Sequence, residues 1–153
     1  MPVERIRMLI ATLWVGSIWT IGYLAAPTLF TTLADRVLAG TIAGSLFRSQ
    51  AWLSVACAIA MLALLRGQAT GKRRVQTWQI AAAMLACTVI GYFGLQPFMA
   101  ALKAAAGPGG VMDAEARTRF GVLHGVSSAI YLVQSLLGAA LIWRLAGRSA
   151  SAA

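Results

Sequence analysis

Acidic residues are the scarcest class in this 153-residue chain, with four Asp and Glu against 13 Lys and Arg. Charged residues of either sign make up 11% of the sequence, whereas 59% of the residues are apolar. A water-soluble domain has about 25% charged and about 45–50% apolar residues. The chain therefore has too little polar surface to cover a soluble globule, and its length fits one domain. We expect an integral membrane protein that has the lipid bilayer as its partner.

Cysteine and histidine are also scarce, and Cys57, Cys87 and His124 are the whole set. Both cysteines lie inside apolar runs without CxxC spacing, which is typical of cysteines that pack as small apolar residues. Metal sites need several N, S or O ligands at coordinating spacing, and the sequence has no such set. The serines near His124 lack the orienting acid of a hydrolase triad. We therefore expect no metal, no cofactor and no enzymatic activity.

The net charge of +9 would by itself suit a nucleic-acid-binding protein. The basic residues, however, lie between long apolar runs rather than along one face of a folded surface. This distribution is typical of charges that flank membrane spans. We therefore expect no nucleic-acid partner.

Four stretches reach the roughly 20 apolar residues needed to cross a hydrocarbon core about 30 Å thick. Each is predicted to be a helix, because lipid offers no water to hydrogen-bond the backbone of an open chain. The predicted fold class is all-α, an antiparallel four-helix membrane bundle forming one domain over residues 1–153. The spans are predicted at residues 8–33, 49–66, 78–102 and 120–143. Short amphipathic outer helices are predicted at 37–48, prolonging the second span, and at 112–119, and a frayed tail at 147–153.

The orientation is predicted from the basic residues in the short connections. The two termini and the second connection hold eight of them, namely Arg5, Arg7, Arg66, Lys72, Arg73, Arg74, Arg144 and Arg148. The other two connections hold five basic residues and three of the four acids. Cytoplasmic loops carry the excess of Lys and Arg. We therefore expect both termini in the cytoplasm and, in a bacterium, location in the inner membrane.

Sequence distance converts into depth at 1.5 Å per helical residue. Counting about 27–33 Å from the cytoplasmic basic edge of each span leads to one layer near the outer interface. That layer contains Pro27, Arg48, Gln96, Pro97 and His124, with Gln50 and Ser127 about one turn below. Polar residues are therefore predicted to gather at the outer end of the bundle.

Two interpretations of this layer remain open. In the first, each polar side chain lies at its own helix end, where water and head groups solvate it. In the second, Arg48, Gln96 and His124 turn inward and form a ligand site together with Gln50 and Ser127. Prolines there would shape the backbone, because each leaves a carbonyl one turn back free for a ligand.

Two glycine pairs flank this layer, Gly40 with Gly44 and Gly121 with Gly125. Glycines four residues apart allow a neighbouring helix to approach closely, so we predict helix packing at both pairs. His124 lies inside the second pair. Its role is open between a structural histidine, a substrate- or proton-linked group and a metal or haem ligand.

Three sequence blocks resemble a known family. They are LWVGSIWTIGYLAAPTLFTTL at Leu13–Leu33, DRVLAGTIAGSLFRSQAWLS at Asp35–Ser54 and FGVLHGVSSAIYLVQ at Phe120–Gln134. In order and content they resemble the small bacterial membrane proteins with domain of unknown function 4149, which are similar to transmembrane protein 205. The resemblance extends over residues 8–143, and its matching positions are Trp14, Gly16, Pro27, Phe30, Gly40, Gly44, Phe47, His124 and Ser127.

The resemblance implies a multi-pass membrane fold and says little about chemistry. Relatives of transmembrane protein 205 are linked to the handling of platinum-type drugs and to secretory traffic, without an established transport mechanism. A dedicated soft-metal route needs many Cys, Met and His ligands, which this chain lacks.

We expect a non-enzymatic membrane protein that binds or passes a small solute at an outward-facing polar site. Arg48 is predicted to hold an anion through two hydrogen bonds, and His124 to supply a pH-dependent donor. One alternative is a structural or assembly subunit that packs through small residues, as a homo-oligomer or in a larger membrane complex. The other alternative is a haem- or metal-binding redox subunit that uses His124.

Overall fold

The computed structural model describes residues 3–67 and 71–149, and every regular element in these ranges is a helix. The elements in chain order are α1 (Val3–Trp19), the π-helix η1 (Thr20–Ala25), α2 (Ala26–Thr32), α3 (Arg36–Arg66), α4 (Lys72–Thr88), the π-helix η2 (Val89–Leu95), α5 (Gln96–Ala104), the 3-10 turn η3 (Pro108–Gly110) and α6 (Ala114–Ser149). α1, η1 and α2 follow one another without a break, as do α4, η2 and α5. The predicted all-α bundle of four long helical segments is confirmed.

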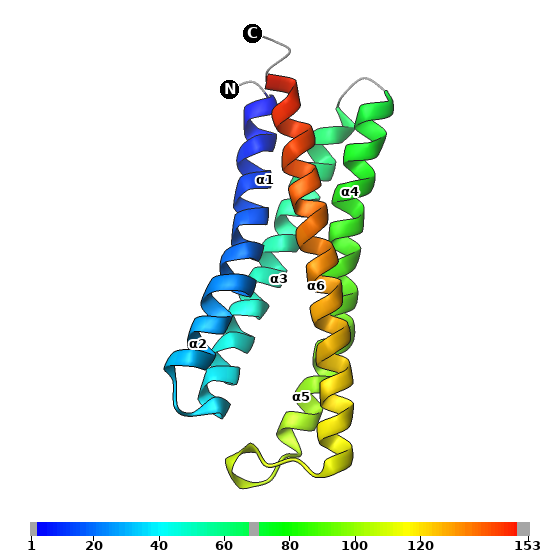
Figure 1. Ribbon diagram of the computed structural model, residues 1–153. Coiled ribbons are helices and arrows are strands. Elements are labelled where there is room, and N and C mark those ends of the chain that lie inside the picture. The colour runs from blue at the N-terminus through cyan, green and yellow to red at the C-terminus, as the bar shows by residue number, and fades with distance from the viewer. Residues whose placement is uncertain (1–2, 68–70, 150–153) are drawn as a thin grey trace.

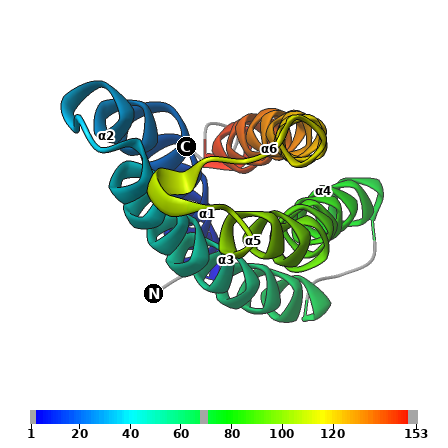
Figure 2. The same cartoon turned by 90° about the horizontal axis from the view of Figure 1, so that it is seen from below.

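The four segments lie side by side and alternate in direction (Figure 1). α6 packs against α1 on one side and α4 on the other, and α3 completes the ring between α1 and α4 (Figure 2). The start of α1 and the end of α6 lie at one end of the bundle, which we call the terminal end (Figure 1). The connections at residues 33–35 and 105–113 lie at the opposite end, which we call the loop end.

Each segment is long and apolar enough to cross a membrane; the four are Val3–Thr32, Arg36–Arg66, Lys72–Ala104 and Ala114–Gly147. Lengths of 30 to 34 residues correspond to about 45–51 Å of α-helix. That exceeds the hydrocarbon core of about 30 Å and approaches the whole bilayer, at about 40–45 Å. Large apolar side chains are exposed on the outside of the bundle, among them Trp143 at 83%. The chain thus has the features of a multi-pass membrane protein.

Both outer stretches are continuous with a long helix. Residues 37–48, which the sequence predicts to prolong the second span, form the first part of α3, and residues 114–119 form the first part of α6. Each long helix starts at an aspartate cap: Asp35 accepts hydrogen bonds from the backbone N–H groups of Val37 and Leu38, and Asp113 accepts one from Ala116. No proline follows in either helix to end it. The predicted frayed tail is helical through Ser149, and residues 150–153 lie outside the described residues.

Each π-helix lies just before a proline, η1 before Pro27 and η2 before Pro97. Proline has no N–H, so the carbonyl four residues earlier loses its α-helical donor. In a π-helix, a carbonyl accepts from the N–H five residues on, as Ile21 does from Ala26. Both π-helices therefore end within two residues of a proline.

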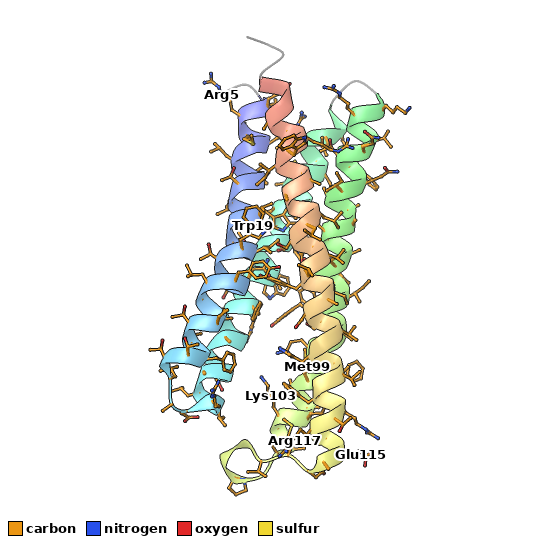
Figure 3. All side chains as sticks on the ribbon, viewed as in Figure 1. Arg5, Trp19, Met99, Lys103, Glu115 and Arg117 are labelled. Carbon is orange, nitrogen blue, oxygen red and sulfur yellow. The ribbon has the colours of Figure 1, made fainter. Side chains whose placement is uncertain are left out.

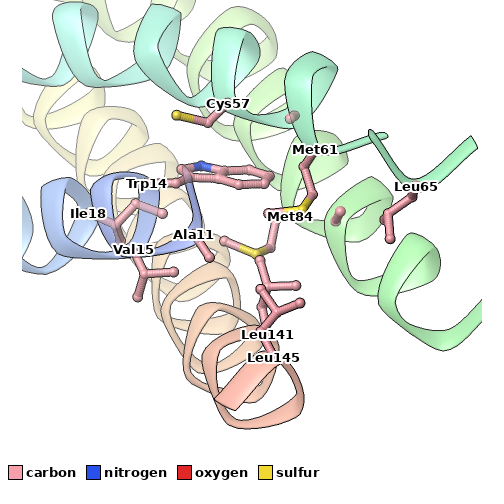
Figure 4. Close-up of a cluster of buried hydrophobic side chains, with 12 residues drawn as sticks. Ala11, Trp14, Val15, Ile18, Cys57, Met61, Leu65, Met84, Leu141 and Leu145 are labelled. Carbon is pink, nitrogen blue, oxygen red and sulfur yellow. The ribbon is translucent and has the colours of Figure 1, made fainter. Parts of the chain in front are cut away.

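The buried apolar core lies toward the terminal end, where all four segments contribute to it. Trp14, Ile18, Met61, Met84 and Leu141 are fully buried there and come from all four segments (Figure 4). In lipid, close packing rather than the exclusion of water holds helices together. This apolar half therefore fixes the positions of the segments at the loop end.

Arg7 closes the core at the terminal end. Arg7 is 2% exposed, and its guanidinium group donates a hydrogen bond to the carbonyl of Leu64, in the last turn of α3. A cation at a helix C-terminus satisfies carbonyls that lack intrahelical donors and interacts favourably with the helix dipole. Nearby, Arg144 donates to Gln76 at 2.6 Å and joins α6 to α4.

Candidate functional site

One face of α6 changes from apolar to polar along its length. Residues seven apart lie on the same face of a packed helix, with a second row three or four residues between them. Toward the terminal end this face carries Gly138, Leu141 and Leu145, which are buried. Toward the loop end the same two rows continue as Gln134, Tyr131, Ser127, His124, Phe120 and Arg117. We call this the inner face of α6, because its buried half contacts the core.

Hydrogen bonds fix the inner face at mid-bundle. Gln134 donates to Thr88 at 2.8 Å, and Trp19 donates to Ser135 at 2.7 Å. Thr88 is the residue immediately before η2, and Trp19 is the residue immediately before η1. Adjacent residues of α6 are therefore bonded to the starting point of both π-helices.

The two π-helices also share the sequence Ile-Gly-Tyr, and both glycines face α6. A Cβ added at Gly22 would overlap the ring of Tyr131, whose hydroxyl donates to the Ile18 carbonyl at 2.7 Å. A Cβ added at Gly91 would lie 3.4 Å from the Cγ2 of Ile130. The first and third segments thus pack on α6 in equivalent ways. This internal symmetry adds to the shared position of Pro27 and Pro97 after the two π-helices.

Gln50 belongs to the packing of this middle layer rather than to an open site. It is buried, and its amide donates to the hydroxyl of Ser54 at 2.6 Å. The indole of Trp14 donates to the same hydroxyl at 2.9 Å, which joins α1 to α3. Buried polar groups of this kind need internal partners, and Gln50 has one. The predicted role of Gln50 in ligand binding therefore lacks support from its position.

An aromatic layer separates the core from the loop end. The ring of Tyr131 makes edge contacts with Phe47, at 5.4 Å between centroids, and with Tyr23, at 6.3 Å. Beyond this layer the bundle divides into two helix pairs, because α2 packs on the start of α3 while α5 packs on the start of α6. The two pairs diverge toward the loop end (Figure 1).

Lys103 lies between the diverging pairs. Its side chain and that of Met99 extend from α5 toward α2 and α3 (Figure 3). The ammonium group is 5.5 Å from the centre of the Phe120 ring on α6. It is also 3.8 Å from the position that a Cβ would take at Gly40 on α3, and that position is 3.9 Å from Phe30 on α2. Residues of all four helices at the loop end therefore meet around one cation.

The acidic groups of the loop end are engaged elsewhere. Asp35 and Asp113 cap the starts of α3 and α6. Glu115 pairs with Arg119 at 2.6 Å on the exposed side of α6. Within the described residues, Lys103 has no carboxylate partner. The space between the helix pairs therefore contains a positive charge that this part of the chain does not neutralise.

His124 lies on the inner face of α6, one turn after Phe120 in the direction of the terminal end. The two rings are stacked, with 6.0 Å between centroids and 6° between planes. The imidazole is exposed. Ser127 follows on the same face and is half-buried. Lys103, Phe120 and His124 thus form one contiguous group, and we call it the loop-end cluster.

Arg48 has the predicted depth but lies on a different face of its helix. It is exposed, and it shares the face of α3 that carries Ser45, Trp52 and Ile59, all of which are exposed. Gln96 is half-buried at the start of α5. Neither side chain has a hydrogen-bond or ion-pair partner among the described residues. Among the described residues, neither makes a hydrogen bond or an ion pair with His124.

The predicted close packing at the glycine pairs is not found within the single chain, apart from Gly40. A Cβ at Gly44, Gly121 or Gly125 would have nothing within 4 Å. Packing at these three positions stays a prediction for contacts with another chain. Over the described residues, no three side chains among His, Cys, Asp and Glu are grouped to hold a metal ion.

Two residues of the loop-end cluster, Lys103 and Phe120, are not among the site residues predicted from the sequence. Lys103 counts there as a charge of the outer connection, although α5 extends to Ala104 and places the ammonium group over the Phe120 ring. Phe120 marks only the start of a span. The seven-residue spacing from Arg117 to Leu145 is the signal that identifies the inner face of α6.

Comparison with protein families gives one match, to the family described as Domain of unknown function (DUF4149), over residues 9–108. The matched region extends from α1 through α5 and into the loop that follows. Comparison with curated proteins and with solved structures gives no match. Because the family match takes in well over half of the chain, and with it Lys103 and the first three helical segments, this four-helix protein belongs to the DUF4149 family.

Proposed function

We propose that the protein is a non-enzymatic, multi-pass membrane protein that binds a small anionic solute at the loop end of the bundle. The observation that supports this most directly is the position of Lys103. Its ammonium group lies between two helix pairs, over an aromatic ring and without a carboxylate partner in the described residues. A lysine in such surroundings attracts anions as a point charge.

His124 and Arg48 have secondary roles in this proposal. An imidazole carries at least one N–H donor, so His124 adds a donor beside Phe120. Arg48, on the outward face of α3, contributes to the positive potential that draws anions toward the loop end. Gln96 and Ser127 supply neutral polar groups at the base of the same layer, where Pro27 and Pro97 follow the π-helices.

The loop end faces away from the cytoplasm in our proposal. The basic residues at the terminal end outnumber those at the loop end, and Asp35, Asp113 and Glu115 are all at the loop end. The Lys and Arg excess supports cytoplasmic termini and, in a bacterium, an inner-membrane location. The solute is then taken from the outer side. The blocks around Trp14, Pro27 and His124 also support the proposed similarity to transmembrane protein 205.

Titration calorimetry of the purified protein with butyl phosphate and with butyrate tests anion binding. Loss of a charge-assisted contact costs about 1.5–3 kcal/mol, so Lys103→Ala is expected to weaken binding at least about tenfold. Lys103→Arg keeps the charge and most of the affinity. Arg119→Gln, which removes an exposed cation of the same end, is the matched control and leaves affinity unchanged.

Arg48→Ala and His124→Ala test how much these two side chains contribute to anion binding. We expect Arg48→Ala and His124→Ala each to change affinity less than Lys103→Ala does. Equal affinity of Lys103→Ala and the wild-type protein would overturn the proposed site.

A second candidate function is assembly with another membrane chain. The observation in its favour is the open space at Gly121 and Gly125 on an exposed stretch of α6. Purification in a mild detergent separates the candidates. A solute-binding protein is recovered alone or as a homo-oligomer, whereas an assembly subunit is recovered with a second protein.

A further inference from the structure

The depth of the loop-end cluster matches the phosphate layer of a bilayer. Lys103 lies 29 residues after Arg74, and Phe120 lies 24 residues before Arg144. At 1.5 Å per residue these separations are about 43 Å and about 36 Å from the basic residues of the terminal end. The whole bilayer, head groups included, is about 40–45 Å thick. The ammonium group of Lys103 therefore lies at the level of the outer head groups.

The sides of the loop end, rather than its tip, give access to Lys103. Residues 105–113 cross from α5 toward α3 (Figure 2). A Cβ added at Gly110 would lie only 2.8 Å from the Cγ2 of Val37, so this connection touches the start of α3. Lys103 is exposed, as are Phe30 on α2 and His124 on α6. An amphiphile in the outer leaflet therefore reaches Lys103 beside the connection.

The side chains between Lys103 and the middle of the bundle suit an acyl chain better than a small polar solute. Met99 lies one turn before Lys103 on α5 (Figure 3), and Phe30 lies beside Gly40. The aromatic layer of Phe47 and Tyr131 lies beneath. One cation above an apolar and aromatic surface is complementary to an amphiphile, whose charge occupies one end and whose hydrocarbon fills the rest.

We propose that the loop-end cluster binds an anionic phospholipid of the outer leaflet, with the lipid phosphate on Lys103 and an acyl chain along the apolar and aromatic side chains beside it. This inference rests on the proposed function and names its ligand class. The charges support it, because the three acids of this end are engaged in caps and in the pair with Arg119. Arg36, Arg48 and Arg117 add to the positive charge there.

The test is lipid retention in nanodiscs of phosphatidylcholine containing one tenth phosphatidylglycerol. The protein is released into detergent, and bound lipid is identified by native mass spectrometry. Wild type and Lys103→Arg are expected to retain phosphatidylglycerol, as is the control Arg119→Gln. Lys103→Ala is expected to retain about tenfold less, the effect of losing a single charge-assisted contact. Thermal unfolding followed by circular dichroism establishes that the variants are folded.

Inorganic phosphate and butyl phosphate form the second arm, which separates the two sources of phosphate. Soluble phosphate that binds through Lys103, without Lys103-dependent lipid retention, overturns the lipid inference and leaves the proposed function standing. Equal lipid retention by Lys103→Ala and wild type also overturns the inference. Absence of both lipid and soluble anion binding at Lys103 overturns the inference and the proposed function together.

Discussion

Gln134 donates a hydrogen bond of 2.8 Å to Thr88, which joins the middle of α6 to the residue just before η2. Both side chains are buried, at 3% and 4% exposure. This bond lies where the inner face of α6 changes from apolar to polar. It therefore positions the loop-end cluster, although it is remote from the cluster.

Replacing one partner of this bond is expected to destabilise the protein. Thr88→Val leaves the Gln134 amide without its partner, at a cost of about 1–3 kcal/mol, toward the lower limit in a membrane. The double variant Thr88→Val with Gln134→Leu removes both groups and is expected to recover part of the loss. Unfolding by dodecyl sulfate, followed by circular dichroism, measures each free energy. Additive losses in the double variant would show that the bond does not couple the helices.

Gly22→Ala is expected to disrupt the packing of η1 on α6. The new Cβ overlaps the Tyr131 ring, which is held by its hydrogen bond to the Ile18 carbonyl. Overpacking of this kind costs about 1–3 kcal/mol. The control is Gly16→Ala, where a Cβ meets nothing within 4 Å, and alanine there stabilises the helix by up to about 1 kcal/mol. Opposite signs in the same unfolding assay are expected, and equal effects would contradict the close contact at Gly22.

Arg7→Leu is expected to weaken the terminal end. The substitution removes the donor to the Leu64 carbonyl at the end of α3, at a cost of about 1–3 kcal/mol. Arg5→Leu removes an exposed positive charge close to it (Figure 3). This control is expected to change stability by no more than about 0.5 kcal/mol. A similar loss in both variants would indicate a general effect of charge rather than the specific contact of Arg7.

Topology reporters test the orientation of the bundle. A reporter inserted after Gly110 is expected to be active on the outer side, and one fused after Ala153 in the cytoplasm. The expectation follows from the excess of basic residues at the terminal end. The same compartment for both reporters would contradict an even number of spans between the termini and the shared depth of Lys103 and Phe120.

The sequence predicts the depth of a side chain along the bundle better than the direction in which the side chain points. The spans, their number and the polar loop end follow from length and hydropathy, and the four helical segments agree. The count along each helix gave His124 and Arg48 the same depth. It gave no direction for either side chain, and Arg48 lies on the exposed face while His124 lies on the inner face.

Helix ends are harder to predict than spans. The sequence predicts that residues 37–48 prolong the second span, and Asp35 caps them at the start of α3. Residues 114–119 continue into α6, because Asp113 caps them and nothing later interrupts them. The π-helices before Pro27 and Pro97 were also missed. Their effect on the backbone is visible only once α6 is seen to pack on both Ile-Gly-Tyr sequences.

The amino-acid order alone determined that this chain forms four lipid-facing helices, since apolar runs of such length leave the backbone no other way to satisfy its hydrogen bonds in a bilayer. Tertiary packing decided which polar groups meet. The surroundings of a side chain depend on the neighbouring helices. Lys103, Phe120 and His124 lie together where the two helix pairs, α2 with α3 and α5 with α6, diverge beyond Tyr131.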